Sequence, residues 1–438
     1  MSKTSESFCI LPWVHLYKNM DDGVKLCCVD KGTSLGSLKE DSAESIRGND
    51  KFVELRKKFL TGEKPDRCKE CWSHERNGYE SYRQSSNFNY RDIIDNTPEF
   101  FSDKPLELKY LDYRPSNLCN LACKICSPRF STKLIDPWIE ADQLTLEEGR
   151  HLTKLNSTRV DIKDLQQEFK NIDYVYFAGG EPMIAEDHWE LLDFLSKQTP
   201  ENIRVKYNTN LTHLSFKGKN AGEYWKKFSK VTIGASIDGY GEGFEHMRSG
   251  GKWDTILQNL NTLKSLIDTV DREILIKYRY PKKNMGIELL CDSTIGWINL
   301  KSVFKLHKFL VENRYIKLND RYTTKLGIKP LNYPYGASLA TTPPELKEEL
   351  LEAIEEYKEW FTDVYPYTNT AWEANIKSLE NMIHNSVYDQ KQLMDWIKLN
   401  KIIDKKYGLH TPTAFKFKSN EWNTKFKLMY DLNKSDLI

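Results

Sequence analysis

Between residues 105 and 335, short strand-like runs alternate with amphipathic helical stretches, and this alternation restricts the possible folds more than any other feature. The predicted strands are 106–114, 174–180, 203–210, 230–238, 274–280, 287–295 and 325–334. The clearest predicted helices are 188–197, 253–267 and 300–313. Strands and helices that alternate at this spacing form parallel β/α sheets or barrels. In such folds the functional residues lie on loops that follow the carboxyl ends of the strands.

The regions on either side differ from this β/α region. Residues 1–90 are rich in loops and cysteines, with short strand signals and one amphipathic helix near residues 51–60. Residues 91–104 are typical of a linker. Residues 336–438 are predicted to be mostly helical, beginning at a proline-led helix start in TTPPELKEELLEAI. The sequence therefore predicts three domains, with the β/α domain at 105–335.

The composition argues against some classes of partner. Lys and Arg number 64 and Asp and Glu 63, so the formal net charge of +1 gives no indication of nucleic-acid binding. No apolar run approaches the roughly 20 residues of a membrane-spanning helix. The start MSKTSESFCILPW lacks the apolar region of a signal peptide. We therefore expect a cytoplasmic protein without a membrane partner.

Eight of the nine cysteines lie before residue 127, and only Cys291, in an apolar strand, follows as an expected core thiol. In the reducing cytosol such clustering indicates metal ligands rather than disulfides. Cys119, Cys123 and Cys126, in the run CNLACKIC, directly follow the first strand of the β/α region. Thiolates select zinc or iron–sulfur clusters, and closed sites of both kinds use four ligands. Three cysteines therefore predict a cluster with one open iron.

This CxxxCxxC pattern after the first strand of a β/α barrel resembles that of the radical SAM superfamily. The resemblance implies an α/β fold, a partial (β/α)6 TIM-type barrel with an N-terminal cysteine-rich iron–sulfur module and a mostly helical C-terminal region. It also implies that S-adenosylmethionine (SAM) binds the open iron of a [4Fe–4S] cluster held by the three cysteines.

Motifs at the ends of the next strands support the resemblance. AGGEP, after the second strand, is similar to the family's GGEP motif, whose bare glycine backbone permits close approach of a ligand. The implied contacts of the SAM amino group are Gly179, Gly180, Glu181 and Pro182. YNTNL, after the third strand, resembles the family's TNG-type segment and implies a SAM contact at Asn208, although Leu211 stands where glycine is usual.

The fourth strand ends in ASIDG, and the segment FEHMRSGG follows it. Together they resemble the S-x-D-G…R…G segment of the peptide- and sugar-modifying branch of the superfamily. The resemblance implies that Ser236 and Asp238 lie near the SAM ribose and that Arg248 pairs with the SAM carboxylate. Ile125 replaces the aromatic residue that usually packs near the adenine, a role that its apolar side chain still permits.

The N-terminal region carries a second set of thiols, namely Cys9, Cys27, Cys68 and Cys71. Four cysteines are enough for a closed zinc site or a [4Fe–4S] cluster. The segments around them resemble the twitch/SPASM modules of radical SAM enzymes, which usually follow the barrel and here precede it. The resemblance favours an auxiliary [4Fe–4S] cluster over zinc. Cys28 is the spare thiol, although Cys27 and Cys28 can exchange roles.

The resemblance implies an activity. An external electron donor such as flavodoxin or ferredoxin reduces the first cluster, and SAM is cleaved to methionine and a 5′-deoxyadenosyl radical that abstracts hydrogen from a substrate. The accessory module favours a peptide, protein or sugar-type substrate, which is oxidised or cross-linked with the help of the auxiliary cluster. The alternative is a non-catalytic iron–sulfur or zinc scaffold. The sequence assigns no catalytic role to its strand-end candidates Asp112, Tyr113, Tyr207 and Tyr280.

Overall fold

The computed structural model describes residues 4–76, 78, 80–97, 101–155, 168–277, 285–318, 324–365 and 367–431. The chain forms two compact units, each built from three segments. Unit 1 comprises Met1–Ser116, Leu155–Tyr207 and Glu223–Val231. Unit 2 comprises Asn117–Lys154, Asn208–Gly222 and Thr232–Ile438. Strands β7 (Arg204–Thr209) and β10 (Lys230–Ser236) each contribute residues to both units.

Unit 1 begins with the cysteine-rich module. Its elements are α1 (Leu11–Val14), β1 (His15–Lys18), β2 (Gly23–Lys25), β3 (Gly36–Ser37), α2 (Ala43–Gly48), α3 (Asp50–Thr61), η1 (Asp66–Cys68), α4 (Lys69–Arg76), α5 (Tyr82–Asn89) and α6 (Arg91–Asn96). Helix α3 is the helix predicted near residues 51–60. It begins where Asn49 accepts the Phe52 N–H and ends at Gly62, whose left-handed φ of 85° suits glycine. Helix α6 occupies the start of the predicted linker.

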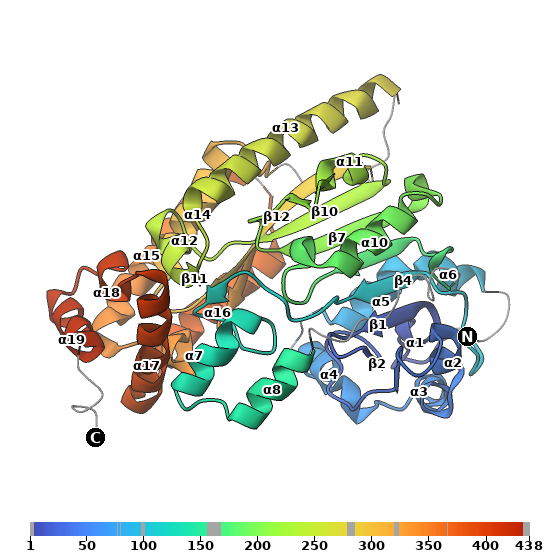
Figure 1. Ribbon diagram of the computed structural model, residues 1–438, viewed down its shortest axis with the longest axis horizontal. Coiled ribbons are helices and arrows are strands. Elements are labelled where there is room, and N and C mark those ends of the chain that lie inside the picture. The colour runs from blue at the N-terminus through green and yellow to red at the C-terminus, as the bar shows by residue number, and fades with distance from the viewer. Residues whose placement is uncertain are drawn as a thin grey trace. The chain divides into compact units, whose positions relative to one another are not determined.

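The sheet of unit 1 has the strand order β3-β2-β1-β4-β6-β7, with β4 at Tyr110–Tyr113 and β6 at Tyr174–Phe177. Strand β1 pairs in parallel with β4, β4 with β6, and β6 with β7, whereas β2 is antiparallel to both β1 and β3. Figure 1 shows β1 beside β4. The cysteine-rich module thus extends the sheet at the edge of β4.

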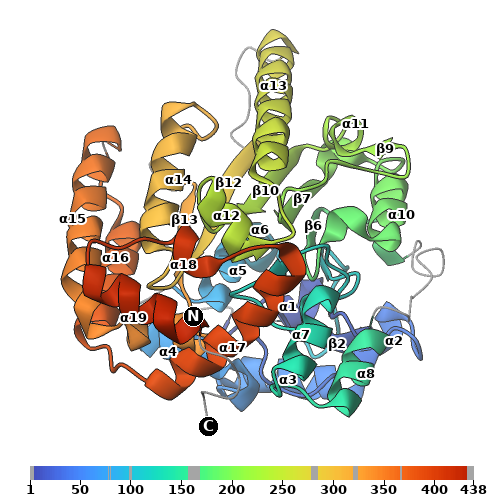
Figure 2. The same ribbon diagram turned by 60° about the vertical axis from the view of Figure 1, so that its left-hand side comes forward.

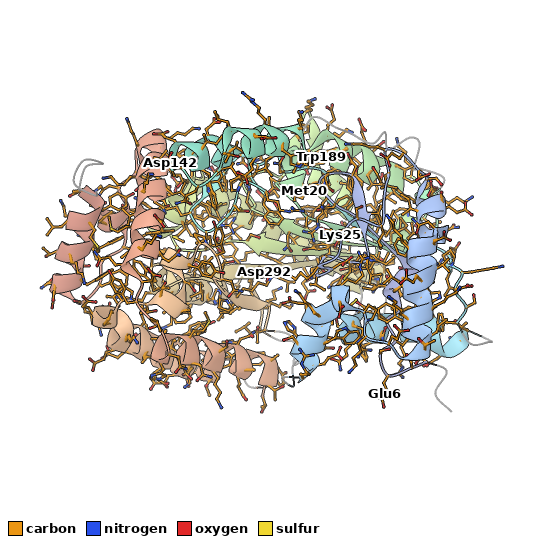
Figure 3. The ribbon with its side chains drawn as sticks, turned by 90° about the horizontal axis from the view of Figure 1, so that it is seen from below. Glu6, Met20, Lys25, Asp142, Trp189 and Asp292 are labelled. Carbon is orange, nitrogen blue, oxygen red and sulfur yellow. The ribbon has the colours of Figure 1, made fainter. Side chains whose placement is uncertain are left out.

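The two faces of these strands differ in chemistry, because successive side chains point to opposite sides. The face toward helix α10 (Glu186–Leu195) is apolar and aromatic, and its buried members are Leu111, Tyr113, Val175, Phe177, Val205 and Tyr207. Tyr113 donates to Asp187 at 3.0 Å, and His188 lies 3.1 Å from the Tyr207 hydroxyl. Trp189 of the same helix, labelled in Figure 3, is buried. The opposite face, called here the polar strand face, carries Tyr110, Asp112, Tyr174, Tyr176, Arg204 and Lys206.

Unit 2 contains the remaining strands of the barrel, β10, β12 (Gly286–Ile295) and β13 (Leu326–Pro330), in that order. Strands β12 and β13 are parallel. Helices α13 (Trp253–Lys277) and α14 (Leu300–Glu312) belong to the same unit. Strands β4, β6 and β7 in unit 1 and β10, β12 and β13 in unit 2 are the six strands of the predicted α/β fold. The predicted fold class, a partial (β/α)6 TIM-type barrel, is confirmed.

The predicted strand 274–280 is wrong where the structure describes it, because residues 274–277 form the last turn of α13. The helix continues because no glycine or proline interrupts it between 253 and 277. Its buried residues are Ile256, Leu260, Leu263 and Val270, whereas Leu275 and Ile276 are exposed. In both Figure 1 and Figure 2 the end of α13 projects past the strands of unit 2. Residues 278–280 lie outside the described residues.

The C-terminal part of unit 2 is mostly helical, as predicted. Its helices are α15 (Lys347–Val364), α16 (Thr370–His384), α17 (Gln390–Tyr407), α18 (Thr411–Ala414) and α19 (Asn420–Asp431). Their core is aromatic, with Trp297 in edge contact with both Trp396 and Trp422. Unit 2 also holds α7 (Ile135–Glu140), α8 (Leu146–Lys154) and α12 (Glu242–Met247). None of the helices in the described part of the chain has the length and apolar character needed to span a membrane.

Candidate functional site

The three-cysteine loop lies in unit 2, directly after the first barrel strand in sequence. Cys119 and Cys123 are buried with Leu121 in a small apolar cluster, and the half-buried Cys126 packs against it. The Cys126 N–H donates to the Cys123 carbonyl at 3.1 Å, which turns the chain between the second and third thiols. The loop thus gathers three thiols from eight consecutive residues.

A short antiparallel pairing brings Arg248 to this loop. Strand β5 (Ala122–Cys123) pairs with β11 (Arg248–Ser249), so that Arg248 lies opposite Cys123. The Arg248 Nη1 is 3.9 Å from the Cys123 Sγ. The Arg248 Nη2 is 2.7 Å from an Asp238 carboxylate oxygen, and both side chains are almost fully buried. A cation is therefore fixed beside the second thiol of the loop.

Asp238 holds this cation in place. Its other carboxylate oxygen accepts the Thr294 N–H at 2.8 Å, and its backbone carbonyl accepts the Asn299 side chain at 2.9 Å. Burial raises the pKa of Asp238, and Arg248 and the Thr294 N–H oppose that rise. Burial acts against the charged form of Arg248, but Asp238 and the neighbouring thiols raise its pKa overall. Asp238 thus has its partners within the protein, and its contact with a ribose stays a prediction.

The segment after the third strand reaches the first thiol. The Asn210 Nδ2 lies 3.9 Å from the Cys119 Sγ and donates to the Asn120 Oδ1 at 2.9 Å. Leu211, which stands in the place of the usual glycine, has a φ of 59° and is fully buried. This left-handed backbone is the conformation that glycine adopts without strain. The sequence departs from the motif here, but the backbone retains the turn.

Two buried atoms in unit 2 fit a polar ligand. The Arg248 Nε and the Asn208 Oδ1 have no hydrogen-bond partner among the described residues. A buried polar atom without a partner is costly, so each is expected to bind a group from outside the protein. Of the other predicted SAM contacts, Ser236 ends β10 half-buried, and Ile125 packs against the main core of the unit.

The GGEP segment lies in unit 1, after β6. Gly179 has a φ of 117°, and a Cβ there would lie 3.0 Å from the Ser116 carbonyl oxygen, so only glycine fits. The Gly180 N–H donates to the same carbonyl at 2.9 Å. The buried Glu181 accepts the Met183 N–H at 3.1 Å, and Pro182 opens a short 3-10 helix. The motif is thus a turn that requires glycine and is hydrogen-bonded to the segment that leads into the cysteine loop.

The N-terminal cysteines form a separate site within unit 1. One small pocket is lined by four thiols, those of Cys9, Cys27, Cys68 and Cys71. Cys28 does not line this pocket and is half-buried. The lining supports Cys27 rather than Cys28 as the fourth ligand, and the ligand set stays a prediction.

These thiols need a cation to ionise. The pKa of Cys9 is raised to about 12, chiefly by burial, and the nearby Cys71 acts in the same direction. Burial raises the pKa of Cys27, Cys68 and Cys71 as well. Thiolates crowded in an apolar pocket become stable only when metal compensates their charge. The donor set therefore fits a metal centre.

Four cysteines can close a zinc site, or they can bind the four irons of a [4Fe–4S] cluster, each cysteine on a different iron.

Two partly buried arginine–carboxylate pairs fix the segments that carry these thiols. Arg67, next to Cys68, donates twice to Asp30 at 2.9 and 2.6 Å, and Asp30 also accepts the Leu26 N–H next to Cys27. Sequence reasoning missed these two residues, because pairs distant in the chain leave no local pattern.

The second pair anchors the first and last thiols of the set. Arg83 donates twice to Glu75 at 2.9 Å and to the Phe8 carbonyl, next to Cys9, at 2.6 Å. Glu75 lies one turn after Cys71 in α4, so Arg83 ties that helix to the Cys9 segment. Charge-assisted bonds of this kind give rigidity as well as energy.

Both cysteine sets fall within regions that match known families. Residues 113–281 match the model of the Radical SAM superfamily, and residues 9–72 match the SPASM model, described as an iron-sulfur cluster-binding domain. The chain is a radical SAM protein. Its SPASM domain precedes the barrel, as the cysteine order predicted. Membership implies a [4Fe–4S] cluster that binds SAM and auxiliary iron–sulfur binding in the SPASM domain.

Solved structures give more distant likenesses. The radical SAM protein SuiB of Streptococcus suis, in its SAM-bound crystal structure, is 15% identical with a TM-score of 0.33, and the match covers 71% of this chain and 60% of SuiB. The structure entitled native anSMEcpe with bound AdoMet and Cp18Cys peptide is 16% identical with a TM-score of 0.34, covering 75% of this chain and 84% of that one. No curated protein sequence matches the chain. These likenesses are too distant to carry a functional argument.

The described strand-end residues considered as catalytic candidates in this radical SAM protein lie on two different faces of the sheet in unit 1. Tyr113 and Tyr207 are bound to α10, so both are packing residues. Asp112 is fully buried on the polar strand face. Its two carboxylate oxygens accept hydrogen bonds from the Arg114 guanidinium at 3.2 and 3.4 Å. Burial raises the pKa of Asp112 to about 6, although Arg114 opposes the rise. Tyr280 lies outside the described residues.

Cys28 also borders the polar strand face. The pKa of Cys28 is raised to about 11, chiefly by burial, and Asp112 acts in the same direction. Beside it, the hydroxyls of Tyr82 and Tyr110 are 2.9 Å apart. Arg114 stacks over the ring of Tyr17 at 5.0 Å. Within unit 1, Cys28 therefore lies next to the aromatic and charged side chains of the polar strand face.

Proposed function

We propose that this radical SAM protein is an enzyme that reductively cleaves SAM and abstracts hydrogen from a peptide, protein or sugar-type substrate, with net oxidation or cross-linking of that substrate. The bound cluster and SAM supply the hard step, one-electron cleavage of SAM to methionine and a 5′-deoxyadenosyl radical. The protein supplies binding, orientation and exclusion of water. The proposed substrate class rests on the SPASM domain.

One observation carries the proposal, the difference between the two thiol sets. The loop of Cys119, Cys123 and Cys126 offers three thiols and a fixed cation, Arg248, whereas the SPASM pocket offers four thiols. Three cysteine ligands leave one iron of a [4Fe–4S] cluster open for another ligand, whereas four cysteines occupy all four irons. We therefore propose catalysis at the loop and an auxiliary cluster in the SPASM pocket.

The proposed work of the residues at the loop is to place SAM. Arg248 supplies positive charge and a buried Nε donor, which suits a carboxylate, and Asp238 keeps its guanidinium in one orientation. Asn208 supplies a buried acceptor oxygen, which suits an ammonium or hydroxyl group. The turn at Gly179 supplies bare backbone in unit 1.

Cys9, Cys27, Cys68 and Cys71 would hold the proposed auxiliary cluster, which would supply a one-electron acceptor or a ligand for the substrate. The charges of Arg67 and Arg83 are paired with Asp30 and Glu75, and these pairs hold the segments around the pocket in place. Rigid surroundings reduce the reorganisation that electron transfer requires. The reductant of the first cluster is proposed to be flavodoxin or ferredoxin. A cytoplasmic location is proposed because clustered cysteines suit metal ligands in a reducing compartment.

Anaerobic reconstitution tests the proposal. The full chain, loaded with iron and sulfide and supplied with SAM and dithionite, is expected to release 5′-deoxyadenosine. The variant Cys119→Ala/Cys123→Ala/Cys126→Ala is expected to release none, and Cys291→Ala, which changes a core thiol outside both sets, is expected to match the wild type. A wild-type protein that takes up iron but releases no 5′-deoxyadenosine would favour the alternative, a non-catalytic iron–sulfur or zinc scaffold.

A further inference from the structure

Lys124 lies inside the cysteine loop, between Cys123 and Cys126, and its side chain is almost completely excluded from solvent. Lysine is among the residues least often buried, because removing its ammonium from water is costly without a partner. A lysine at this place therefore requires a counter-charge, and neither family model accounts for the residue that supplies it, since the radical SAM match ends at residue 281.

The counter-charge comes from the C-terminal helices. The Lys124 Nζ forms an ion pair with Asp404 of α17, which is itself buried. Asp404 also accepts the Thr411 N–H and hydroxyl, both at 2.8 Å, and a hydrogen bond from the Tyr430 hydroxyl. Lys124 donates to the Thr411 hydroxyl as well. Elements α17, α18 and α19 thus converge on one lysine of the cysteine loop.

Both members of the pair are buried, with Lys124 1% and Asp404 2% exposed. Burial alone would raise the pKa of Asp404, but Lys124, Tyr430 and Thr411 lower it overall. Two opposite charges in a dry interior hold each other strongly, because little solvent screens them.

Other residues of α17 contact the same loop. The Trp396 Nε1 donates to the Lys124 backbone carbonyl at 3.3 Å. Tyr407 lies against Gly250, where a Cβ would be 3.0 Å from its ring and 3.5 Å from the Asn120 carbonyl. Tyr407 also packs against the apolar cluster that contains Ala122 of the loop. Positions 396, 404 and 407 lie on one face of the helix, as its period of 3.6 residues requires.

We propose that the C-terminal helical region is a structural part of the SAM-cluster site. Asp404 is a positioning residue, which holds Lys124 and thereby fixes the backbone that presents Cys123 and Cys126. Figure 2 shows α17, α18 and α19 together in unit 2. The inference rests on the proposed function, because it assumes that the loop thiols hold the SAM-binding cluster.

The test compares iron content and the SAM response of the cluster in the full chain. The variants Asp404→Asn and Lys124→Met each leave one buried charge without its partner, whereas the double variant Lys124→Met/Asp404→Asn leaves neither. Lys398→Ala is the matched control on the same helix, because it breaks the ion pair of 2.7 Å between Lys398 and the exposed Asp142, which is labelled in Figure 3.

Each single variant is expected to lose about one cluster's worth of iron and sulfide, while the SPASM cluster stays as an internal reference for folding. Any remaining reduced loop cluster is expected to need at least about tenfold more SAM for its change in electron paramagnetic resonance spectrum. The double variant is expected to recover most of the iron, and Lys398→Ala to match the wild type. The recovery separates charge compensation from a general loss of packing.

Full iron and an unchanged SAM response in both single variants would overturn the inference. A double variant that is no better than the single variants, while its SPASM cluster is retained, would also contradict it. A wild-type protein whose reduced cluster gives no response to SAM would instead contradict the proposed function. The two failures are therefore distinguishable.

Discussion

Arg248 and Asp238 form a buried ion pair, with 2.7 Å between the guanidinium and the carboxylate, directly beside the Cys123 thiol. Removing one partner of such a pair costs about 3–5 kcal/mol, because the other charge stays buried. We therefore predict that Asp238→Asn lowers the free energy of unfolding by about 3 kcal/mol and weakens SAM binding by at least about tenfold. Chemical unfolding and a SAM titration of the reduced cluster measure the two effects.

A double variant tests whether Asp238 acts through Arg248. If positioning of the guanidinium is its whole contribution, Arg248→Met/Asp238→Asn binds SAM no more weakly than Arg248→Met alone, because the second change has nothing left to position. Additive losses would show a direct contact of Asp238 with SAM. Lys252→Ala, which breaks an exposed ion pair of 3.0 Å with Glu245 nearby, is the control and is expected to leave SAM binding unchanged.

Local patterns in the sequence predicted most of the strands and the SPASM domain before the barrel, and the two ligand sets stay predictions. The strand predicted at 274–280 failed because Leu275 and Ile276 are apolar but exposed, and local composition alone does not show that a helix of 25 residues continues through them. The period of the preceding apolar residues was the better signal, since Leu260 and Leu263 repeat at helical spacing.

Contacts between residues that are distant in the chain could not be predicted from local sequence patterns. Lys124 and Asp404 are 280 residues apart, and nothing near either one identifies the other. The departure at Leu211 is a related case, because its left-handed φ of 59° is imposed by the surrounding fold rather than by its own preference. Sequence motifs proposed the SAM contacts, which stay predictions, whereas the partners of Arg248 and Lys124 emerged only from the packing.

The adjacent residues Cys27 and Cys28 are predicted to differ in their roles at the auxiliary site. Only Cys27 lines the SPASM pocket, so we predict that Cys27→Ala abolishes auxiliary iron and that Cys28→Ala retains it. Iron and sulfide are measured after reconstitution in the background Cys119→Ala/Cys123→Ala/Cys126→Ala, in which the loop cluster is absent. Loss of iron from Cys28→Ala with retention in Cys27→Ala would reverse the assignment.

The turn at Gly179 is predicted not to tolerate a residue with a side chain. Alanine at a φ of 117° is strained by about 1–3 kcal/mol, and its Cβ would approach the Ser116 carbonyl to 3.0 Å. We predict that Gly179→Ala destabilises the protein by about 2 kcal/mol and weakens SAM binding. Gly48→Ala is the control, because Gly48 is exposed at the end of α2 with no atom within 4 Å of a new Cβ. Equal effects of the two changes on unfolding would contradict the prediction.

His307 gives the protein a defined sensitivity to acid. The ring is fully buried in α14, 2.8 Å from the Tyr357 hydroxyl and 3.4 Å from the Ser293 hydroxyl, and burial lowers its pKa to about 3. An unfolded histidine has a pKa of about 6.5. Between these values the unfolded chain binds a proton that the folded chain does not, so stability is complete above about pH 6.5 and falls as the pH decreases. The expected loss between pH 7.5 and pH 5 from this group is about 2 kcal/mol.

The variant His307→Gln isolates this contribution, because glutamine retains hydrogen-bonding groups and does not titrate. We predict that it is less stable than the wild type at pH 7.5, since its shape fits the cavity less well, and that the difference shrinks by about 2 kcal/mol at pH 5. Urea unfolding of the two proteins at both pH values measures the change, and the acid lability of the clusters is common to both. His151→Gln, at an exposed position of α8, is expected to keep the wild-type pH dependence. A difference between His307→Gln and the wild type that is the same at both pH values would show that His307 is not kept neutral by burial.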